Sequence, residues 1–357
     1  MSLKTTSYHL IDHMLSKDIF SDNGLLLLSQ GTKLDAADIT MLLNRQIVEI
    51  EVYDEVHSVS KKVTTQIKDL WAHNDYELKD HYLYCLDTIK GLFQQSVNDK
   101  ICPLSDFMET YSPLLERTLE YSFLFHPLHK IKGHDEYTYR HSINVGLLSG
   151  VIGKILGLSK NEQYLLGQMG LLHDIGKLRV HDDILNKPGN LSQEEFDAIK
   201  LHTVYGYEIL KKMEGVSELI YEGALYHHER LDGSGYPYRL KEGEIPFMIQ
   251  ILSVADTYDA ICSDRIYKLK SSPYYAANEL MQGIYKGNFN PEIVVPFVRY
   301  LANSSVGDQA LLDNGKSGEI VYIFPEEPHR PLIKVENEYL DLRVERHIQI
   351  VDIASSN

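Results

Sequence analysis

Apolar residues follow two different spacings along this chain. Between about residues 100 and 300 they recur every three or four positions, for example at Val145, Leu148, Val151, Ile152 and Ile155. Nearer both ends they alternate with polar residues or form short runs. The first spacing is typical of helices with one buried face, and the second of short strands. We therefore expect a mainly α protein, with an all-helical domain and small β-containing units at the N- and C-terminal ends.

Changes in this pattern divide the chain into four segments. Residues 1-55 are predicted to form a small α/β unit and residues 56-100 a helical linker. Residues 101-303 would be the helical domain, and residues 304-357 a small β unit. In the end units we expect strands at 24–28, 47–52, 318–324 and 331–335, more strand between 342 and 350, and a helix at 35–43. The sequence does not show whether the two ends pack together.

The helical domain contains a clear helix start. Ser192 is followed three residues later by Glu195, the pattern of a capping box, in which each side chain binds the other residue's backbone N–H. The apolar stripe after it predicts one helix that continues through His202. Later helices are expected at 220–227 and 246–261.

Composition and charge exclude several classes of protein. Hydrophobic residues make up 43% and charged residues 24%, as in ordinary globular proteins. No apolar run is long enough to span a membrane, and the N-terminus lacks the pattern of a secretory signal. The formal net charge of −16 would repel a nucleic-acid polymer. Cys85, Cys102 and Cys262 lie far apart, which favours reduced thiols and a cytoplasmic location. The sequence leaves a homodimer open.

Histidines carry the main chemical signal. Most of the 16 lie in polar or irregular contexts, where we expect solvated or structural roles. A smaller set lies on apolar helical segments together with carboxylates: His141, His173, Asp174, His202, His227, His228 and Asp256. A single His-Asp pair could be a capped helix end, and a buried Asp256 could be neutralised by an Arg or Lys. One metal centre would offset the free-energy cost of burying all these side chains.

The ligand types in this set favour two metal ions. Five imidazoles and two carboxylates suit iron, manganese or zinc. They are too many for one ion with an open position, whereas the two oxygens of Asp174 could each face one ion. Two ions about 3.5–4 Å apart activate water and stabilise the transition state of phosphoryl transfer.

The order of these residues resembles the HD-GYP subgroup of the HD phosphohydrolases. The resemblance covers about residues 130 to 300 and rests on His173-Asp174-Ile-Gly-Lys177, then His202, then the run from His227-His228 to Gly235-Tyr236-Pro237, then Asp256. It implies an all-α fold and hydrolysis of cyclic di-GMP to linear pGpG and/or GMP by a metal-bridging hydroxide. It also implies a metal centre, for which the ligand count predicts two divalent ions, with iron or manganese expected. By matching position, their ligands would be His141, His173, Asp174, His202, His227, His228 and Asp256.

The substrate side can be assigned in the same way. Lys177 lies one turn past Asp174 and could reach the scissile phosphate as a catalytic cation. The other expected substrate contacts are Gly235, Tyr236, Pro237, Arg265 and Lys268. Arg265 and Lys268 could equally be cations at the end of a surface helix. The Gly-Tyr-Pro loop could instead be a docking surface for a diguanylate cyclase.

One position departs from the pattern of some family members. They place a Glu one helical turn before the first histidine, where it helps to hold a third metal, and this chain has Tyr137 there. Asp135 and Glu136 are near in sequence but point to other sides of a helix. We therefore expect two tightly bound ions.

Three other functions remain open on the sequence. The motif specifies metals and a phosphate but not the bases, so cyclic GMP-AMP is an alternative substrate. The Gly-Tyr-Pro element counts against a nucleotide or alarmone phosphohydrolase. A sensor that binds cyclic dinucleotides without cleaving them usually lacks some ligands, and all seven are present here.

Overall fold

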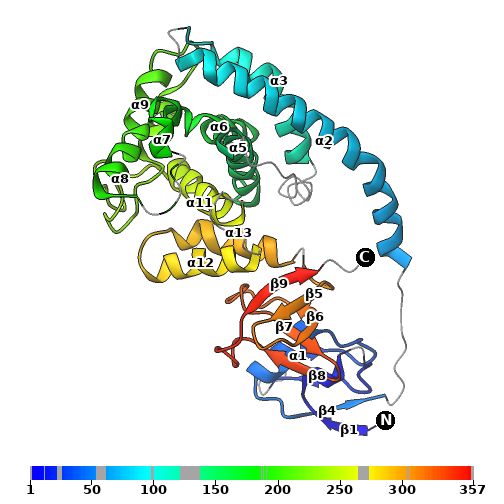
Figure 1. Cartoon of the computed structure of the whole chain (residues 1–357). Helices are drawn as coiled ribbons and strands as arrows, with labels where there is room; N and C mark the ends of the chain where they lie inside the picture. Colours follow the sequence, from blue (N-terminus) through cyan, green and yellow to red (C-terminus); the bar gives the residue numbers. More distant parts are fainter. Residues whose placement is uncertain are drawn as a thin grey trace. The chain divides into compact units, whose positions relative to one another are not determined.

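The computed structural model describes residues 2–11, 13–21, 26–53, 62–97, 100–120, 137–185, 187, 189, 191–263, 273–303 and 305–354. The chain forms two compact units (Figure 1). One unit contains residues 1–71 together with residues 305–357, so the two ends of the chain belong to the same unit. The other contains residues 72–304 and carries all the predicted metal ligands.

The larger unit is helical in its described residues, and the predicted mainly α fold is confirmed (Figure 1). Helix α2, Lys62–Val97, leads into this unit. The other helices are α3 Leu104–Glu120, α5 Tyr137–Ile155, α6 Lys160–Leu172, the 3-10 helix η3 Ile175–Arg179, α7 Asp182–Leu185, α8 Gln193–Lys200, α9 His202–Leu210, α10 Glu218–Tyr226, α11 Phe247–Cys262, α12 Pro273–Tyr285 and α13 Pro291–Asn303. Among the described residues, no helix is both long and apolar enough to cross a membrane.

Helices α5 and α6 pack side by side at the centre of this unit (Figure 1). Almost every residue of α5 from Tyr139 to Gly153 is buried. The helices approach closely at Gly146 and Gly170, where a Cβ atom on Gly170 would lie 2.5 Å from the Gly146 Cα. Because glycine lacks that atom, the backbones can touch, and the last turn of α6 is held against the buried face of α5.

The predicted capping box at Ser192 is confirmed. The Ser192 hydroxyl accepts from the Glu195 backbone N–H, and the Glu195 carboxylate accepts from the Ser192 N–H. The prediction that this helix continues through His202 is wrong, because α8 ends at Lys200 and His202 begins α9. The His202 imidazole binds the Ile199 carbonyl, which lies in the last turn of α8.

The smaller unit is built from antiparallel strands around a short helix. The N-terminal segment contains β1 Ser2–Thr5, η1 Tyr8–Leu10, β2 Ile19–Phe20, β3 Leu26–Leu28, α1 Ala36–Asn44 and β4 Glu49–Val52. The C-terminal segment contains β5 Gln309–Leu312, β6 Ser317–Tyr322, β7 Leu332–Val335, β8 Glu338–Asp341 and β9 Ile350–Ala354, in the order β8-β7-β6-β5-β9. Strands β1 and β4 pair, as do β2 and β3. The two segments meet where the His9 and Tyr339 rings pack edge to face, with centroids 5.4 Å apart.

The strand predicted to begin at Leu342 is wrong. Residues 342–344 form a turn between β8 and β9, and the flanking strands lie on either side of it. Asp341 makes the turn, because its carboxylate accepts from the backbone N–H of Arg343 and from the Arg343 guanidinium. The alternating apolar residues at 342 and 344 imitated a strand, but this local side-chain pairing competes with the sheet.

Candidate metal centre

The structure brings the seven predicted ligands together in the helical unit. They come from α5 (His141), the end of α6 (His173 and Asp174), the start of α9 (His202), the end of α10 (His227 and His228) and α11 (Asp256). All are buried except His228, whose side chain is 19% exposed. Two groups have ligand atoms that all lie within 4.8 Å of one another: His141, His173 and Asp174, and His202, His227 and His228.

Helix ends orient three of the imidazoles. The Nδ1 atoms of His173, His202 and His227 bind the carbonyls of Gly170, Ile199 and Ala224, at 2.7, 2.7 and 3.0 Å. In each case the carbonyl lies three residues earlier, in the last turn of a helix, where carbonyls lack helical partners. Since Nδ1 donates to a carbonyl, Nε2 is the nitrogen that faces the cluster, and in the neutral ring it carries the lone pair of a metal ligand.

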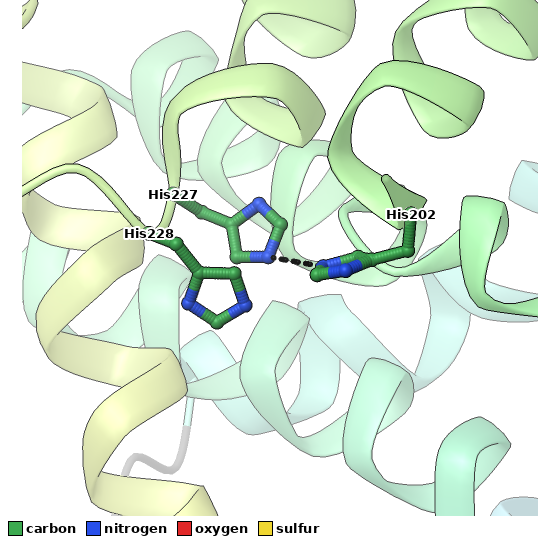
Figure 2. A group of neighbouring side chains, drawn as sticks. All are labelled: His202, His227 and His228. Atoms are coloured by element: carbon green, nitrogen blue, oxygen red, sulfur yellow. Dashed lines mark hydrogen bonds between the residues drawn. The ribbon is translucent and has the colours of Figure 1, made fainter. Parts of the chain in front are cut away.

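Figure 2 shows how one of the two groups is arranged. His202 approaches from one helix, and His227 and His228 from the end of another, with the three rings turned toward a common space. The Nε2 atoms of His202 and His227 are 3.3 Å apart. Nitrogen atoms from separate helices are thus close enough to share one cation.

His141 is oriented by a carboxylate that the sequence reasoning missed. Its Nδ1 atom lies 2.7 Å from the Asp259 carboxylate, and its Nε2 atom lies 2.9 Å from the Asp256 carboxylate. Asp259 is fully buried and one helical turn beyond Asp256 on α11. The signal was available, because a second carboxylate in the same apolar helix faces the same side at that spacing.

The two oxygens of Asp174 face different groups of histidines. Its Oδ2 atom lies 3.3 Å from the His173 Nε2 atom and 3.5 Å from that of His141. Its Oδ1 atom lies 3.4 Å from the His202 Nε2 atom and 3.7 Å from that of His227. One carboxylate therefore stands between the two groups.

Buried carboxylates raise the pKa of two imidazoles in the cluster. Burial alone would lower the pKa of His141, but hydrogen bonds to Asp256 and Asp259 raise it above its usual value. Burial likewise opposes protonation of His173, but the neighbouring Asp174 and Asp256 raise its pKa to about 10. Positive charge therefore collects beside the carboxylates, where a divalent cation could replace those protons.

Burial favours the neutral form of the other three imidazoles. Burial lowers the pKa of His202 to about 4. Burial, with the neighbouring imidazoles, also lowers the pKa of His227 and His228 well below the usual value. Neutral imidazoles are the form that binds metals.

Two buried atoms at the centre have no hydrogen-bond partner among the described residues. They are the Nε2 atom of His173 and the Oδ1 atom of Asp174. Leaving buried polar atoms unpaired is costly, and both are good ligands for a divalent cation. The donor set and these orphaned atoms fit a metal ion, so the His/Asp cluster could hold metal.

Comparison with known proteins identifies the helical region. Residues 128–293 match a family model described as HD domain. This chain contains an HD domain. The resemblance predicted from the sequence is thereby confirmed, and the cluster lies inside the matched segment.

Relatives of this HD domain include named phosphodiesterases. A cyclic di-GMP phosphodiesterase of Pseudomonas aeruginosa is 36% identical over 219 residues, which cover 60% of this chain and 52% of that protein. The 3′3′-cGAMP-specific phosphodiesterase 3 of Vibrio cholerae is 39% identical over 132 residues, covering 37% of this chain and 28% of that protein. The matched regions therefore span about half of the first relative and less than a third of the second.

A solved structure shows the same fold. The structure titled Bd1817, a HDG"Y"P protein from Bdellovibrio bacteriovorus, aligns with a TM-score of 0.54 at 15% identity. The alignment covers 84% of this chain and 99% of that chain. At this identity the likeness concerns the fold of the chain.

Lys177 lies at the edge of the cluster in the HD domain. Its ammonium is 2.5 Å from the Oδ2 atom of Asp174, and its side chain is 17% exposed. The Asp174 pKa stays well below its usual range because His173 and Lys177 outweigh the effect of burial. The lysine is thus the group that links the buried carboxylate to solvent.

The Gly-Tyr-Pro loop of the HD domain is anchored by Glu229, another residue that the sequence reasoning missed. This buried carboxylate accepts from the backbone N–H groups of Tyr238, Arg239 and Leu240, at 2.6, 3.1 and 2.9 Å. Gly235 packs against the same segment, where a Cβ atom would lie 2.4 Å from the Glu229 Cα. An acidic residue directly after the His-His pair was the available signal.

Of the predicted substrate residues, some lie beside the cluster and others lie outside the described residues. The Tyr236 ring lies over His228 with centroids 4.7 Å apart, and a cis peptide bond joins it to Pro237. Gly235 is buried in the loop. Arg265, Lys268, Asp135 and Glu136 lie outside the described residues. Tyr137 stacks on His141, with ring planes 9° apart and centroids 5.5 Å apart.

Proposed function

We propose that this chain is a metal-dependent phosphodiesterase that hydrolyses cyclic di-GMP to linear pGpG and/or GMP. The observation that carries the proposal is Asp174, with one oxygen facing His141 and His173 and the other facing His202 and His227. A carboxylate between two sets of nitrogen ligands suits two adjacent cations. The name of the Pseudomonas relative supports the choice of substrate.

In this proposal the cluster holds two divalent ions, iron or manganese. Their ligands are His141, His173, Asp174, His202, His227, His228 and Asp256. When bound, such ions lower the pKa of water and neutralise charge on a phosphate. Asp259 and the three helix-end carbonyls keep the imidazoles in the ligand orientation.

Lys177 supplies the mobile cation of the reaction. Hydrolysis forms a bond from a water oxygen to phosphorus, breaks one ester bond and leaves a proton for the departing oxygen. The negative charge on the phosphate oxygens grows as this happens. The Lys177 ammonium, now on Asp174, can turn to the scissile phosphate and stabilise that charge.

Cyclic GMP-AMP is the second candidate substrate, because the Vibrio relative is named for it. The cluster selects for a phosphodiester, and neither its ligands nor Lys177 distinguish one base from another. A cytoplasmic setting fits the buried thiols of Cys85, Cys102 and Cys262. The exposed Tyr238 beside the Gly-Tyr-Pro loop is where a diguanylate cyclase partner would dock.

Anaerobic purification tests the function. The metal content is measured first, and the products from cyclic di-GMP and from cyclic GMP-AMP are then separated by chromatography. We expect bound metal and a linear product from cyclic di-GMP. Bound metal with no turnover of either compound would instead identify a sensor.

A variant of the bridging carboxylate sharpens this test. Asp174→Asn should lose activity and most of the bound metal, because a neutral amide cannot hold two cations as a carboxylate does. Asp183→Asn is the matched control, since that side chain is 90% exposed on α7. Normal turnover by Asp174→Asn would contradict a centre of two ions.

A further inference from the structure

An aromatic pair continues outward from the metal cluster. Tyr236 covers His228, and its ring meets that of Phe196 edge to face, with centroids 6.4 Å apart. Phe196 lies on α8, and 43% of its surface is exposed. Its exposed ring therefore extends a ring surface that begins at a predicted metal ligand.

A cation flanks this aromatic pair. The Lys200 ammonium lies 4.5 Å from the centre of the Phe196 ring and 5.7 Å from that of Tyr236. It also donates to the exposed Asp197, at 2.8 Å. Because exposed ion pairs contribute little to stability, the ammonium can leave Asp197 at low cost. Phe196 and Lys200 are one helical turn apart on α8, and the Tyr236 ring lies close to both of them.

We infer that Phe196, Tyr236 and Lys200 form a subsite for a guanine base. The inference rests on the proposed function and names which part of the substrate these residues bind. Bases stack on aromatic rings, and replacing such a ring with alanine typically weakens binding by about 1–3 kcal/mol per base. The O6 and N7 atoms of guanine both accept hydrogen bonds, which suits a lysine ammonium. Adenine offers an amino group in place of O6, so the cation would meet a donor.

The position of the subsite agrees with the shape of the substrate. The Tyr236 ring is 4.7 Å from that of His228 and 6.5 Å from that of His202. A phosphate at the cluster would thus have a ring surface beside it for the base of an adjoining nucleotide. Cyclic di-GMP and cyclic GMP-AMP both contain guanine, whereas cyclic di-AMP has none. The subsite therefore selects against cyclic di-AMP.

Competition against a substrate without bases tests the subsite. Bis(p-nitrophenyl) phosphate carries no purine, so its turnover reports on the metal cluster. Cyclic di-GMP and cyclic di-AMP are added as inhibitors of that turnover. The proteins are the wild type, Phe196→Ala, Phe196→Trp, Lys200→Met and the control Tyr285→Ala. Tyr285 is 68% exposed on α12. Metal content and thermal unfolding are recorded for each protein.

The subsite predicts a different result for each variant. Phe196→Ala should raise the inhibition constant of cyclic di-GMP about 5- to 20-fold, the lower part of the range for one stacked base. Phe196→Trp should restore it. Lys200→Met, which keeps the aliphatic stem, should reduce the preference for cyclic di-GMP over cyclic di-AMP at least about fivefold. Tyr285→Ala should match the wild type.

Two results would overturn the subsite. One is inhibition constants within about twofold of wild type in both Phe196→Ala and Lys200→Met. The other is loss of metal or of thermal stability in Phe196→Ala, with weaker turnover of the base-free substrate, because that pattern describes a structural ring. Hydrolysis of cyclic di-GMP is followed separately. If the wild type does not cleave it, the proposed function fails, while the inhibition constants still decide the subsite.

Discussion

Three of the predicted metal ligands are oriented by backbone atoms of their own helices. Each of His173, His202 and His227 uses a carbonyl three residues earlier, so the free end of a helix determines which ring nitrogen faces the cluster. His141 lies inside α5, where carbonyls are already paired, and it uses the side chain of Asp259. The Nδ1 atom of each imidazole thus has an acceptor, which is a backbone carbonyl at a helix end and a carboxylate where the histidine lies within a helix.

A variant of Lys177 distinguishes two roles for its charge, which are contact with the substrate phosphate and support of metal binding. Lys177→Ala should lower kcat/KM about 10- to 150-fold, since a hydrogen bond to a charged group contributes about 1.5–3 kcal/mol. Metal content should stay normal, because Asp174 keeps its histidine partners. Steady-state kinetics and elemental analysis give the two values. The exposed Lys286→Ala is the control for loss of one positive charge. Release of the metals would show that Lys177 supports the cluster.

Tyr137 determines how many ions we expect. A phenol is a poor ligand at neutral pH because it titrates near pH ~10. Its ring stacks on His141, and Phe would keep that stack. We therefore expect two tightly bound ions per chain in both wild type and Tyr137→Phe. Tyr137→Glu should add a third, because it supplies a carboxylate one turn before His141. Elemental analysis of the substrate-free proteins measures this, and three ions in the wild type would refute it.

At the scale of elements, signals close together in sequence predicted structure well. The start of α8 followed from Ser192 and Glu195, because the two groups that make the capping box are three residues apart. The break in the helix after Lys200 could not be predicted in this way, since it depends on the direction of the His202 ring. Asp259 and Glu229 were missed for the same reason. Their partners become known only once α5 meets α11 and the loop folds back on itself.

Glu229 couples the His-His pair to the Gly-Tyr-Pro loop. Glu229→Gln keeps the size of the side chain but replaces one acceptor oxygen with an amide that opposes a backbone N–H. We expect faster hydrogen exchange at residues 238–240 and a loss of about 1–3 kcal/mol of stability for the unpaired group. Turnover should fall because Tyr236 loses its fixed place, while metal content persists.

The loop offers a matched control for Glu229. The Glu244 carboxylate is exposed and accepts from a single backbone N–H, that of Lys241, at 2.8 Å. Glu244→Gln keeps an oxygen for that bond, so exchange and turnover should stay near wild type. Equal effects of both changes would mean that Glu229 does not anchor the loop.

At the scale of the whole molecule, the ends of the chain were the hardest part to predict. Each end showed a strand-like pattern, but the pairing of strands far apart in sequence leaves no local trace. The structure places residues 1–71 and 305–357 in one unit, with β5 paired between β6 and the edge strand β9. The seven predicted ligands, in contrast, lie on several helices, and they were predicted because a shared cation would offset the cost of burying such groups and because their order resembles a known family.

The smaller unit carries a histidine that should make its stability depend on pH. Burial and the nearby Arg330 and Arg346 lower the pKa of His329 to about 4, against 6.5 in an unfolded chain. Between these pH values the unfolded chain binds a proton that the folded unit does not bind. As far as His329 is concerned, the free energy of unfolding is therefore highest above pH 6.5. It falls by at most about 3 kcal/mol as the pH drops to about 4.

His329→Gln should flatten this part of the curve of unfolding free energy against pH. His347→Gln is the control, because that side chain is 77% exposed. Denaturant unfolding from pH 7 to 4 measures the difference between wild type and each variant, which removes the contribution of all other titrating groups. Parallel curves for wild type and His329→Gln would show that His329 is protonated in the folded unit as readily as in the unfolded chain.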